Sequence, residues 1–378
     1  MTIGRDRTSP ETHARSTGWV FHERYLWHDT GSAAGYLEAG GWLEPLAHVE
    51  SVATKRRFQN LVEVSELRRE LTDVPPRPAT GEQLLAVHTR EYVARIEELS
   101  ANRGGDAGDR TTAFGRGGFE IAQLAAGGAV CAVEAVVSGT VDNAYALVRP
   151  PGHHALPDRG MGFCIFNNIA VAVRHAQSAL GVGRVAIVDW DVHHGNGTQA
   201  IFYEDPTVLV ISVHQDNCFP PESGTIGERG AGAGVGATLN IPLPAGSGNG
   251  AYIDAFSRVV VPALRGFEPE LVLVASGLDA NGFDPMGRML LHSDTYRALT
   301  EMLLAFTGGR LVVIHEGGYS AFYVPFCGLA IVETLAGRRT AVEDPYLEDV
   351  RLMAGQECSD HQREAIDAAR QFVGRTTG

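Results

Sequence analysis

The sequence is poor in cysteine, and its cysteines are not spaced as pairs. The 378 residues include five cysteines, an odd number, and no two of them form a CxxC pair. A disulfide scaffold needs a dense, even set of cysteines, and a cysteine zinc site needs closely spaced pairs. Both classes are therefore excluded, and we expect a protein of a reducing compartment, the cytoplasm.

Positive charge is also scarce. The chain has 31 Lys and Arg against 45 Asp and Glu, which gives a formal net charge of -14 at pH 7. Proteins that bind nucleic acid nonspecifically need a basic surface to neutralise phosphates. We therefore expect no nucleic-acid partner.

Long apolar runs are missing from the linear sequence as well. No such run approaches the roughly 20 residues that span a bilayer, and the N-terminal stretch MTIGRDRTSPETHARST lacks the apolar core of a secretory signal. We expect no membrane partner and no secretion. We also expect residues 1–17, which are polar, to form a disordered tail before a single domain over residues 18–375.

Short apolar runs alternate with amphipathic ones along the rest of the chain. This alternation of strands and helices is typical of an α/β domain with a parallel sheet that is buried on both faces. The clearest predicted strands are 144–148, 185–188, 208–212, 271–275 and 311–314, and the predicted helices are 116–138, 167–180, 250–265 and 294–307.

Titratable side chains follow four of these strands. In an open α/β sheet, ligands bind outside the carboxyl ends of the strands. Four separate strand ends that bring such groups to one edge therefore predict a functional site there. In chain order, the groups are His153 and His154, then Asp189, Asp191, His193 and His194, then Asp279, and finally His315, Glu316 and Tyr319.

Three of these residues have the chemistry of a metal site. Asp191 and His193 lie two residues apart in an extended segment, so both side chains can point the same way, and Asp279 follows a neighbouring strand. Catalytic zinc takes three such protein ligands and keeps one position open. The alternative is that the aspartates only cap helices or pair with arginines. We favour the metal, which is zinc or, with the same ligands, iron(II).

The stretches around these residues resemble the zinc-dependent histone deacetylase superfamily, and in particular its class II-like bacterial branch, the histone deacetylase-like amidohydrolases. The resemblance covers about residues 18–375. It implies a single catalytic domain with the arginase/deacetylase fold, in which helices cover both faces of a mostly parallel, eight-stranded sheet. It also implies hydrolysis of an acetyl or acyl amide on the Nε of lysine or a similar amine. The matching stretches are PPGHHALPDRGMGFCIFNN (150–168), VDWDVHHGNGTQ (188–199), SVHQDNCFPPESG (212–224), LNIPLPAGSG (239–248), ASGLDANGFDP (275–285) and HEGGYS (315–320).

The resemblance implies a role for each residue of the site. It assigns zinc to Asp191, His193 and Asp279. It assigns proton transfer to His153 and His154, whose partners are Asp189 and Asn196, and it assigns the substrate carbonyl to Tyr319. A histidine titrates near neutral pH and a tyrosine hydroxyl can donate to an oxyanion, so both residue types suit these roles. Because an amide carries no charge, we expect Asn196 to leave His154 easier to deprotonate than a carboxylate partner would.

Further positions match substrate and potassium sites of the family. Phe163 and Phe219 correspond to the walls of a narrow tube that grips the lysine stem, together with Gly162; Asp109 corresponds to a rim aspartate that holds substrate backbone N–H groups, and Met286 to a gate. The structural potassium site maps, mostly through backbone carbonyls, onto Asp189, Asp191, His193, Ser212 and Val213, and a second one onto Phe202 and Val208. We expect His194 and His214 to be structural.

Three rival functions remain to be weighed. An arginase-like ureohydrolase needs two more carboxylates, where this chain has Gly195 and Asn281. An acetylpolyamine amidohydrolase would use the same chemistry with an acidic entrance; the apolar Met286 disfavours it, although the segments 28–50 and 100–115 could supply acids. An inactive acyl-lysine binding protein is disfavoured because every ligand and Tyr319 are present. We therefore expect an acetylated lysine peptide, protein or small amine as substrate, and a homo-oligomer, a dimer or tetramer, with segment 28–50 at its contacts.

Overall fold

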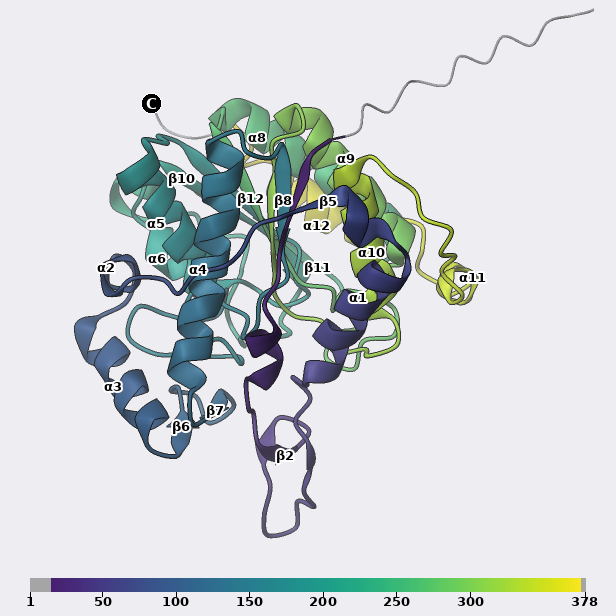
Figure 1. Cartoon of the computed structure of the whole chain (residues 1–378). Helices are drawn as coiled ribbons and strands as arrows, with labels where there is room; N and C mark the ends of the chain where they lie inside the picture. Colours follow the sequence, from purple (N-terminus) through teal and green to yellow (C-terminus); the bar gives the residue numbers. More distant parts are fainter. Residues whose placement is uncertain (1–14, 375–378) are drawn as a thin grey trace, which may run out of the picture.

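The computed structural model describes residues 15–374 (Figure 1). Most of the predicted N-terminal tail, residues 1–14, therefore lies outside the described residues. Thr17 is fully buried and begins the first strand of the central sheet, β1 (Thr17–Val20). The folded domain thus starts slightly earlier than residue 18, because this short strand pairs with two others.

The central sheet has eight strands, all of them parallel, which confirms the predicted fold class. Across the sheet, the strands are β11 (Thr238–Leu243), β10 (Val208–Gln215), β9 (Val185–Asp189), β12 (Leu271–Ser276), β13 (Val312–His315), β8 (Asn143–Ala146), β1 and β5 (Leu71–Asp73). The five predicted strands all form. β1, β5 and β11 were not among them.

Successive residues of a strand point to opposite faces of the sheet, so strands that are apolar at every position make both faces apolar. Helices cover both of these faces. Ala186 and Val188 of β9 belong to one hydrophobic core, and Val185 and Ile187 belong to the other. The first core is closed by α1 (Val52–Val64), α7 (Asn249–Ala255), α8 (Val261–Phe267), α9 (Ser293–Thr307), α10 (Val324–Ala336), α11 (Leu347–Arg351) and α12 (Asp360–Arg370). The second is closed by α2 (Gly81–Leu85), α3 (Arg90–Ala101), α4 (Gly118–Val137), α5 (Asn168–Leu180) and α6 (Asn196–Phe202).

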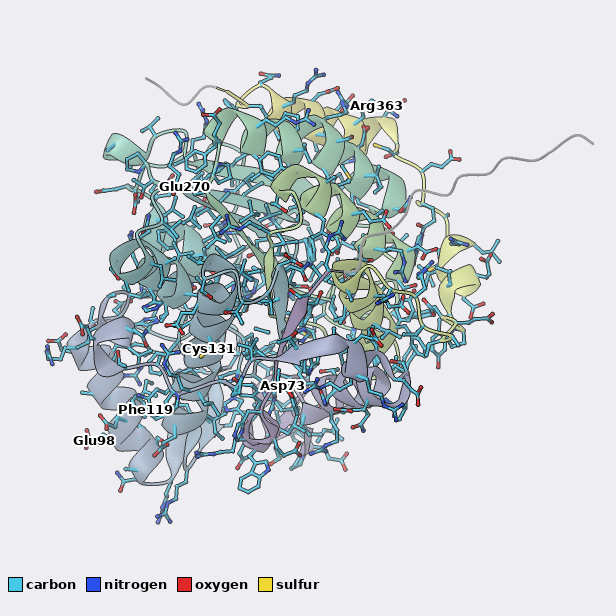
Figure 2. All side chains as sticks on the ribbon, turned by 45° about the horizontal axis from the view of Figure 1, so that its top comes forward. Asp73, Glu98, Phe119, Cys131, Glu270 and Arg363 are labelled. Atoms are coloured by element: carbon cyan, nitrogen blue, oxygen red, sulfur yellow. The ribbon has the colours of Figure 1, made fainter. Side chains whose placement is uncertain are left out.

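Charged side chains lie on the outside of these layers. Figure 2 shows Glu98 on α3, Glu270 before β12 and Arg363 on α12 at the periphery of the molecule. All three are exposed. Their exposure fits the rule that charged side chains are rarely buried unless they are paired.

Helix α4 corrects one expectation from the sequence. It has 20 residues and is apolar enough to cross a membrane by length and composition, although the linear sequence showed no such run, since Glu120 and Glu134 interrupt it. In the fold, 78% of its apolar window is buried, because α4 packs against the sheet and α5. Burial inside the domain explains its composition.

The predicted helix 250–265 forms in three consecutive parts. α7 and α8 are joined by a π-helical turn at Phe256–Val260. Pro262 lies in the first turn of α8, where its missing N–H is tolerated. The chain thus passes a proline without ending the helical segment.

Segment 28–50 forms an arm at the lower end of the view in Figure 1. It contains the antiparallel strands β2 (Ser32–Ala34), β3 (Leu37–Glu38) and β4 (Leu46–Ala47). Several of its large apolar side chains are exposed, among them Trp42 and Leu46. A second small pair, β6 (Gly104–Asp106) and β7 (Ala113–Gly115), lies at the same end of the domain.

Candidate active site

A cavity of about 460 Å³ opens at the carboxyl edge of the central strands. Residues from the loops after β8, β9, β12 and β13 line it, as expected for a parallel sheet. Its walls and floor are formed by Tyr36, Thr111, His154, Gly162, Phe163, His193, Gln215, Asn217, Cys218, Phe219, Pro285, Met286, Arg288 and Tyr319.

The three predicted metal ligands meet beside this cavity. Asp191 and His193 follow β9, Asp279 follows β12, and one ligand atom of each lies within 4.8 Å of the others. His193 Nδ1 lies 3.0 Å from Asp191 Oδ1 and 3.3 Å from Asp279 Oδ2. All three residues are buried. The arrangement could hold a metal ion.

The polar atoms of this group fit a cation. Asp279 Oδ2 is buried, and although His193 Nδ1 lies 3.3 Å away, it accepts no well-directed hydrogen bond from the described residues. Burial, followed by the negative charge of Asp191, raises the pKa of Asp279 to about 6. Two buried carboxylates side by side repel each other unless a positive charge lies between them. A divalent ion would satisfy the unpartnered oxygen and remove this repulsion.

The tandem histidines are held by the partners that the sequence predicted. His153 Nδ1 lies 2.9 Å from Asp189 Oδ2, and His154 Nδ1 lies 2.8 Å from Asn196 Oδ1. Because the Asn196 amide nitrogen faces Met161 Sδ at 3.5 Å, its oxygen is left to accept from His154 Nδ1–H. His154 Nε2 therefore keeps a lone pair, and His154 lines the cavity.

The two imidazoles differ in their affinity for protons, although their ring centroids are only 4.0 Å apart. Burial, together with the positive charges of His153 and His193, lowers the pKa of His154 well below its ordinary value. Burial also disfavours the cation of His153, but the charges of Asp191 and Asp189 outweigh it and raise that pKa to about 10. At neutral pH, the opposite pKa shifts leave His154 neutral and able to accept a proton, and they leave His153 protonated.

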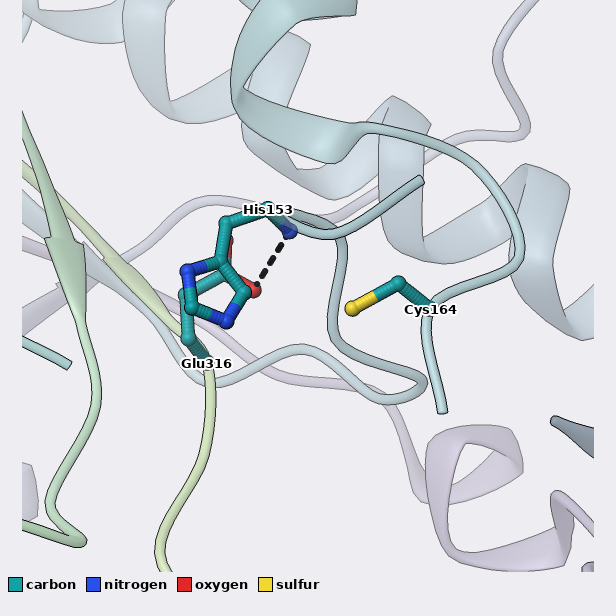
Figure 3. A group of neighbouring side chains, drawn as sticks. All are labelled: His153, Cys164 and Glu316. Carbon is teal, nitrogen blue, oxygen red and sulfur yellow. Dashed lines mark hydrogen bonds between the residues drawn. The ribbon is translucent and has the colours of Figure 1, made fainter. Parts of the chain in front are cut away.

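Glu316 positions the loop that carries these histidines, and the sequence reasoning had given it no role. Its Oε2 accepts hydrogen bonds from the backbone N–H of Gly152, at 2.6 Å, and of His153, at 3.1 Å. Figure 3 shows the bond to His153. The signal was available, since Glu316 follows the buried strand β13 just as Asp191 follows β9.

His153, Glu316 and Cys164 also approach one another closely enough to be considered as metal ligands (Figure 3). Burial raises the pKa of the Cys164 thiol well above its ordinary value, and its Sγ donates to the carbonyl of Gly162 at 3.5 Å. Metals bind thiolates rather than neutral thiols. The Glu316 oxygen that faces His153 already holds two backbone amides. We therefore assign this group to structure.

Tyr319 enters the cavity from a glycine turn after β13. A Cβ atom at Gly317 would lie 2.1 Å from Asp279 Oδ2, so only glycine fits beside these carboxylates. The Gly317 N–H donates to Asp191 Oδ2 at 2.9 Å. Asp284, a second residue that the sequence reasoning missed, accepts from the Tyr319 N–H at 2.8 Å and fixes the turn.

Phe163, Phe219 and Gly162 line the cavity, as predicted for a tube. The Phe219 ring packs at 5.0 Å against His154, and the Phe163 ring at 5.8 Å against Tyr319, measured between ring centroids. A Cβ atom at Gly162 would lie 2.4 Å from His154 and 2.9 Å from Phe219. A side chain at this position would therefore obstruct the space between the rings. Met286 also lines the cavity.

Asp109 does not line the cavity. Its carboxylate accepts hydrogen bonds from the backbone N–H groups of Thr111, Thr112 and Gly162, and from the Thr111 hydroxyl. The contact with Gly162, at 2.7 Å, ties Asp109 to the tube wall. Its predicted contact with substrate backbone stays a prediction.

The residues of the predicted potassium site lie at the ends of two neighbouring strands, since Ser212 of β10 is in register with Asp189 of β9, and Asp191 and His193 follow in the loop after β9. Val213 is buried, as are Phe202 and Val208 of the second predicted site. His194 and His214 are buried and bonded within the protein: His194 to Ser223 and Gln199, and His214 to Ser212 and Gly224. These bonds agree with the structural role expected for both histidines.

A buried ion-pair group connects the N-terminal segment to the loop that carries His153 and His154, and the sequence had not predicted it. Glu50 pairs with Arg149 at 2.8 Å and with Lys55 at 3.2 Å. Arg149 also donates to the carbonyl of His28 at 2.6 Å. Although burial opposes it, Arg149 and Lys55 hold the pKa of Glu50 well below its ordinary value. Lys55 Nζ also lies 5.8 Å from the centre of the Tyr319 ring.

This parallel α/β domain, with acids and imidazoles gathered at the strand ends below an aromatic-walled cavity, is of the arginase/deacetylase type. The comparisons narrow the class. The family model of the histone deacetylase domain matches residues 48–335 of this chain. The chain is 50% identical over 367 residues to a histone deacetylase-like amidohydrolase of Pseudomonas aeruginosa, covering 95% of this chain and 96% of that protein. The protein belongs to the histone deacetylase family and is a hydrolase that acts on amides.

Two further relatives are informative. The structure of the HDA15 HD domain superposes with a TM-score of 0.83 at 32% identity, covering 95% of this chain and 96% of that one. The polyamine deacetylase HDAC10 of Mus musculus is 41% identical over 275 residues, which cover 69% of this chain and 41% of that protein. The family thus includes a member named for polyamines.

Proposed function

We propose that the protein is a zinc-dependent amidohydrolase that removes the acetyl group from the Nε of lysine or a similar amine. The observation that carries this proposal is the unpartnered Oδ2 of Asp279, which lies beside Asp191 and His193 next to the cavity. A buried carboxylate oxygen without a donor is unfavourable unless a cation binds it.

Asp191, His193 and Asp279 would hold the ion. Two carboxylates and one imidazole suit zinc, and they accept iron(II) as well. When bound, the ion would lower the pKa of a water molecule and polarise the amide carbonyl.

The remaining residues of the site move protons and stabilise charge. His154 Nε2 accepts a proton from the attacking water, while Asn196 holds Nδ1–H in place. The water oxygen bonds to the carbonyl carbon, the C–N bond breaks, and the proton passes to the leaving amine, which yields acetate. His153 stays protonated next to Asp189. Because burial raises the pKa of Tyr319, its hydroxyl stays a donor to the developing oxyanion.

The aromatic walls suit a lysine side chain. Phe163 and Phe219 offer apolar surface to its four-carbon stem and leave the acetamide at the bottom. Asp109 supports the wall through Gly162. We also propose that potassium binds at the ends of β9 and β10, through backbone carbonyls near Ser212 and Val213.

Two observations favour acetyl-lysine over an acetylpolyamine. Met286 is apolar, and the cavity lining, all of it in the described part of the chain, contains no Asp or Glu that would pair with a polyamine cation. The alternative remains an acetylpolyamine amidohydrolase, since a relative bears the name polyamine deacetylase. An inactive binding protein would not need the complete set of His154, Tyr319 and the three metal ligands.

The test compares an acetyl-lysine peptide with acetylputrescine on the zinc-loaded protein, before and after chelation. We expect chelator-sensitive release of acetate from the peptide and little from acetylputrescine. The reverse preference would establish the polyamine alternative. A lack of turnover on both substrates, or turnover that resists chelation, would overturn the proposal.

We further propose that the protein works in the cytoplasm as a homo-oligomer, a dimer or tetramer, with segment 28–50 at the contact. The exposed side chains of Trp42 and Leu46 support this assembly. Gel filtration of a variant without residues 36–46 tests it: a protein that is monomeric before and after the deletion excludes the assembly.

A further inference from the structure

Among its lining residues, the cavity has one fixed charge, the guanidinium of Arg288, whose side chain is exposed and therefore lies on the solvent side of the cavity. Among the residues that line the cavity, all within the described chain, Arg288 is the only Lys, Arg, Asp or Glu. Its neighbours at the entrance are uncharged: Tyr36, Gln215, Asn217, Pro285 and Met286. The charge therefore meets whatever part of a substrate stays outside the tube.

Hydrogen bonds hold Arg288 in this place without neutralising it. One nitrogen, Nη1, donates to the carbonyls of Gly287, at 2.7 Å, and Pro285, at 3.3 Å. The backbone N–H donates to Gln215 Oε1 at 2.7 Å, which ties the loop to the end of β10. None of the ion pairs found between residues 15 and 374 includes Arg288. Its side chain is exposed.

Two acids lie in segments beside the cavity, and neither lines it. Asp216, between the lining residues Gln215 and Asn217, is exposed and forms no ion pair with Arg288 among the described residues. The carboxylate of Asp109 holds Thr111, Thr112 and Gly162. More distant acids count less, because salt screens exposed charges beyond about 8–10 Å. The net charge of -14 is spread over the whole chain, whereas Arg288 is part of the entrance.

We infer that Arg288 determines specificity: it selects acetyl-lysine that has acidic residues next to it in a peptide, and it disfavours acetylated polyamines. This inference rests on the proposed amidohydrolase function. A guanidinium presents several donors in one plane, which match a carboxylate. The side chains beside the acetyl-lysine remain at the entrance, where an Asp or Glu can reach Arg288.

A polyamine meets the opposite situation. When its acetamide is at the bottom of the tube, its free ammonium lies one short alkyl chain away, near the entrance. There it meets a like charge and finds no carboxylate in the lining. Met286 contributes only apolar surface, so the electrostatic repulsion of the polyamine ammonium comes from Arg288.

The test uses three acetyl-lysine peptides that differ only in the residues flanking the lysine: Glu, Gln or Lys on both sides. We expect kcat/KM to fall in that order, by about two- to five-fold per step, the range of exposed ion pairs. In Arg288→Gln the three values should converge, and in Arg288→Glu the order should reverse while turnover of acetylputrescine rises. High salt should weaken the preference of the wild type.

Arg265→Gln is the matched control. It removes the same charge from an exposed arginine at the end of α8, near the opposite edge of the sheet, and should leave the preference unchanged. Equal rates on the three wild-type peptides, or an order that persists in Arg288→Gln, would overturn the role of Arg288 while the amidohydrolase function stands. If no peptide turns over, the proposed function has failed, but the binding of the three peptides, measured by fluorescence anisotropy, still tests Arg288. Kd values that rise from the Glu to the Gln to the Lys peptide would support its role. Equal Kd values would overturn that role.

Discussion

His154 is hydrogen-bonded to an uncharged partner, Asn196, so the substitution Asn196→Asp tests whether His154 is the general base. In the wild type, His154 Nδ1 lies 2.8 Å from Asn196 Oδ1, and the imidazole is buried. The new carboxylate would lie at nearly the same distance from a ring that becomes positive on protonation. The substitution should therefore raise the pKa of His154 and make it a poorer base at neutral pH.

The size of the effect follows from the geometry. Two opposite charges about 4 Å apart interact by about 4 kcal/mol at an effective dielectric constant of about 20. At about 1.4 kcal/mol per pKa unit, this is about 3 units. Burial of the new carboxylate reduces the gain, so we expect the acidic limb of the kcat/KM profile to move up by about 1–3 units.

The assay is a pH–rate profile on an acetyl-lysine peptide, measured with metal content held equal. Below the shifted limb, the variant should lose about ten-fold in kcat/KM for each pH unit, because His154 is already protonated. Asn196→Ala is the control: it removes the acceptor without adding charge, so its limb should not move upwards. An unchanged limb in Asn196→Asp would show that His154 is not the group that must be neutral.

Four further predictions follow from the described contacts. Asp279→Asn should reduce bound metal to well below one ion per chain, measured by elemental analysis of the purified protein, and a full metal complement would contradict the assignment of Asp279. Gly317→Ala should also lose metal and activity, because a Cβ atom would lie 2.1 Å from Asp279 Oδ2, and chemical denaturation should show that it still folds; normal metal content would refute the steric argument. Arg149→Met should lower the free energy of unfolding by about 3–5 kcal/mol, measured in urea, because it leaves Glu50 buried with Lys55 as its only ionic partner. Since the pKa of Glu50 is held low in the fold, this stabilisation is present above the ordinary pKa of a glutamate and is lost as the pH falls towards the folded-state value; a difference between wild type and Arg149→Met that does not shrink in acid would contradict it.

The sequence allowed the centre of the sheet to be predicted better than its periphery. The apolar runs of β9 and β12 were recognisable because strands buried on both faces need apolar residues at every position. β5 has only three residues, Leu71–Asp73, and two of them are exposed at the edge of the sheet. β1 contains Gly18 within four residues, so its place in the sheet comes from tertiary pairing rather than from local preference.

The same distinction applies to the site. Asp191, His193 and Asp279 were predictable because each follows a strand whose end must lie at one edge. The roles of Glu316 and Glu50 depend on contacts with residues about 100 or more positions away, namely the amides at Gly152 and His153 and the guanidinium of Arg149. No local pattern specifies such pairs. Arg288 likewise became notable only once the fold showed that no acid accompanies it in the cavity lining.

The position of β1 between β5 and β8 has a consequence for synthesis on the ribosome. Thr17 of β1 pairs with Leu71 of β5 on one side and with Asn143 of β8 on the other. The second edge of β1 therefore stays unpaired until β8 has been synthesised. At typical bacterial-to-eukaryotic translation speeds of about 5–20 residues per second, the wait is roughly 6–25 s. During that interval, Trp19 and Val20, both buried in the finished protein, lack their partners Tyr145 and Ala146 on β8. The nascent chain thus exposes an unpaired strand edge for longer than most small domains need to fold, and a chaperone that shields short apolar segments would act on this N-terminal strand first.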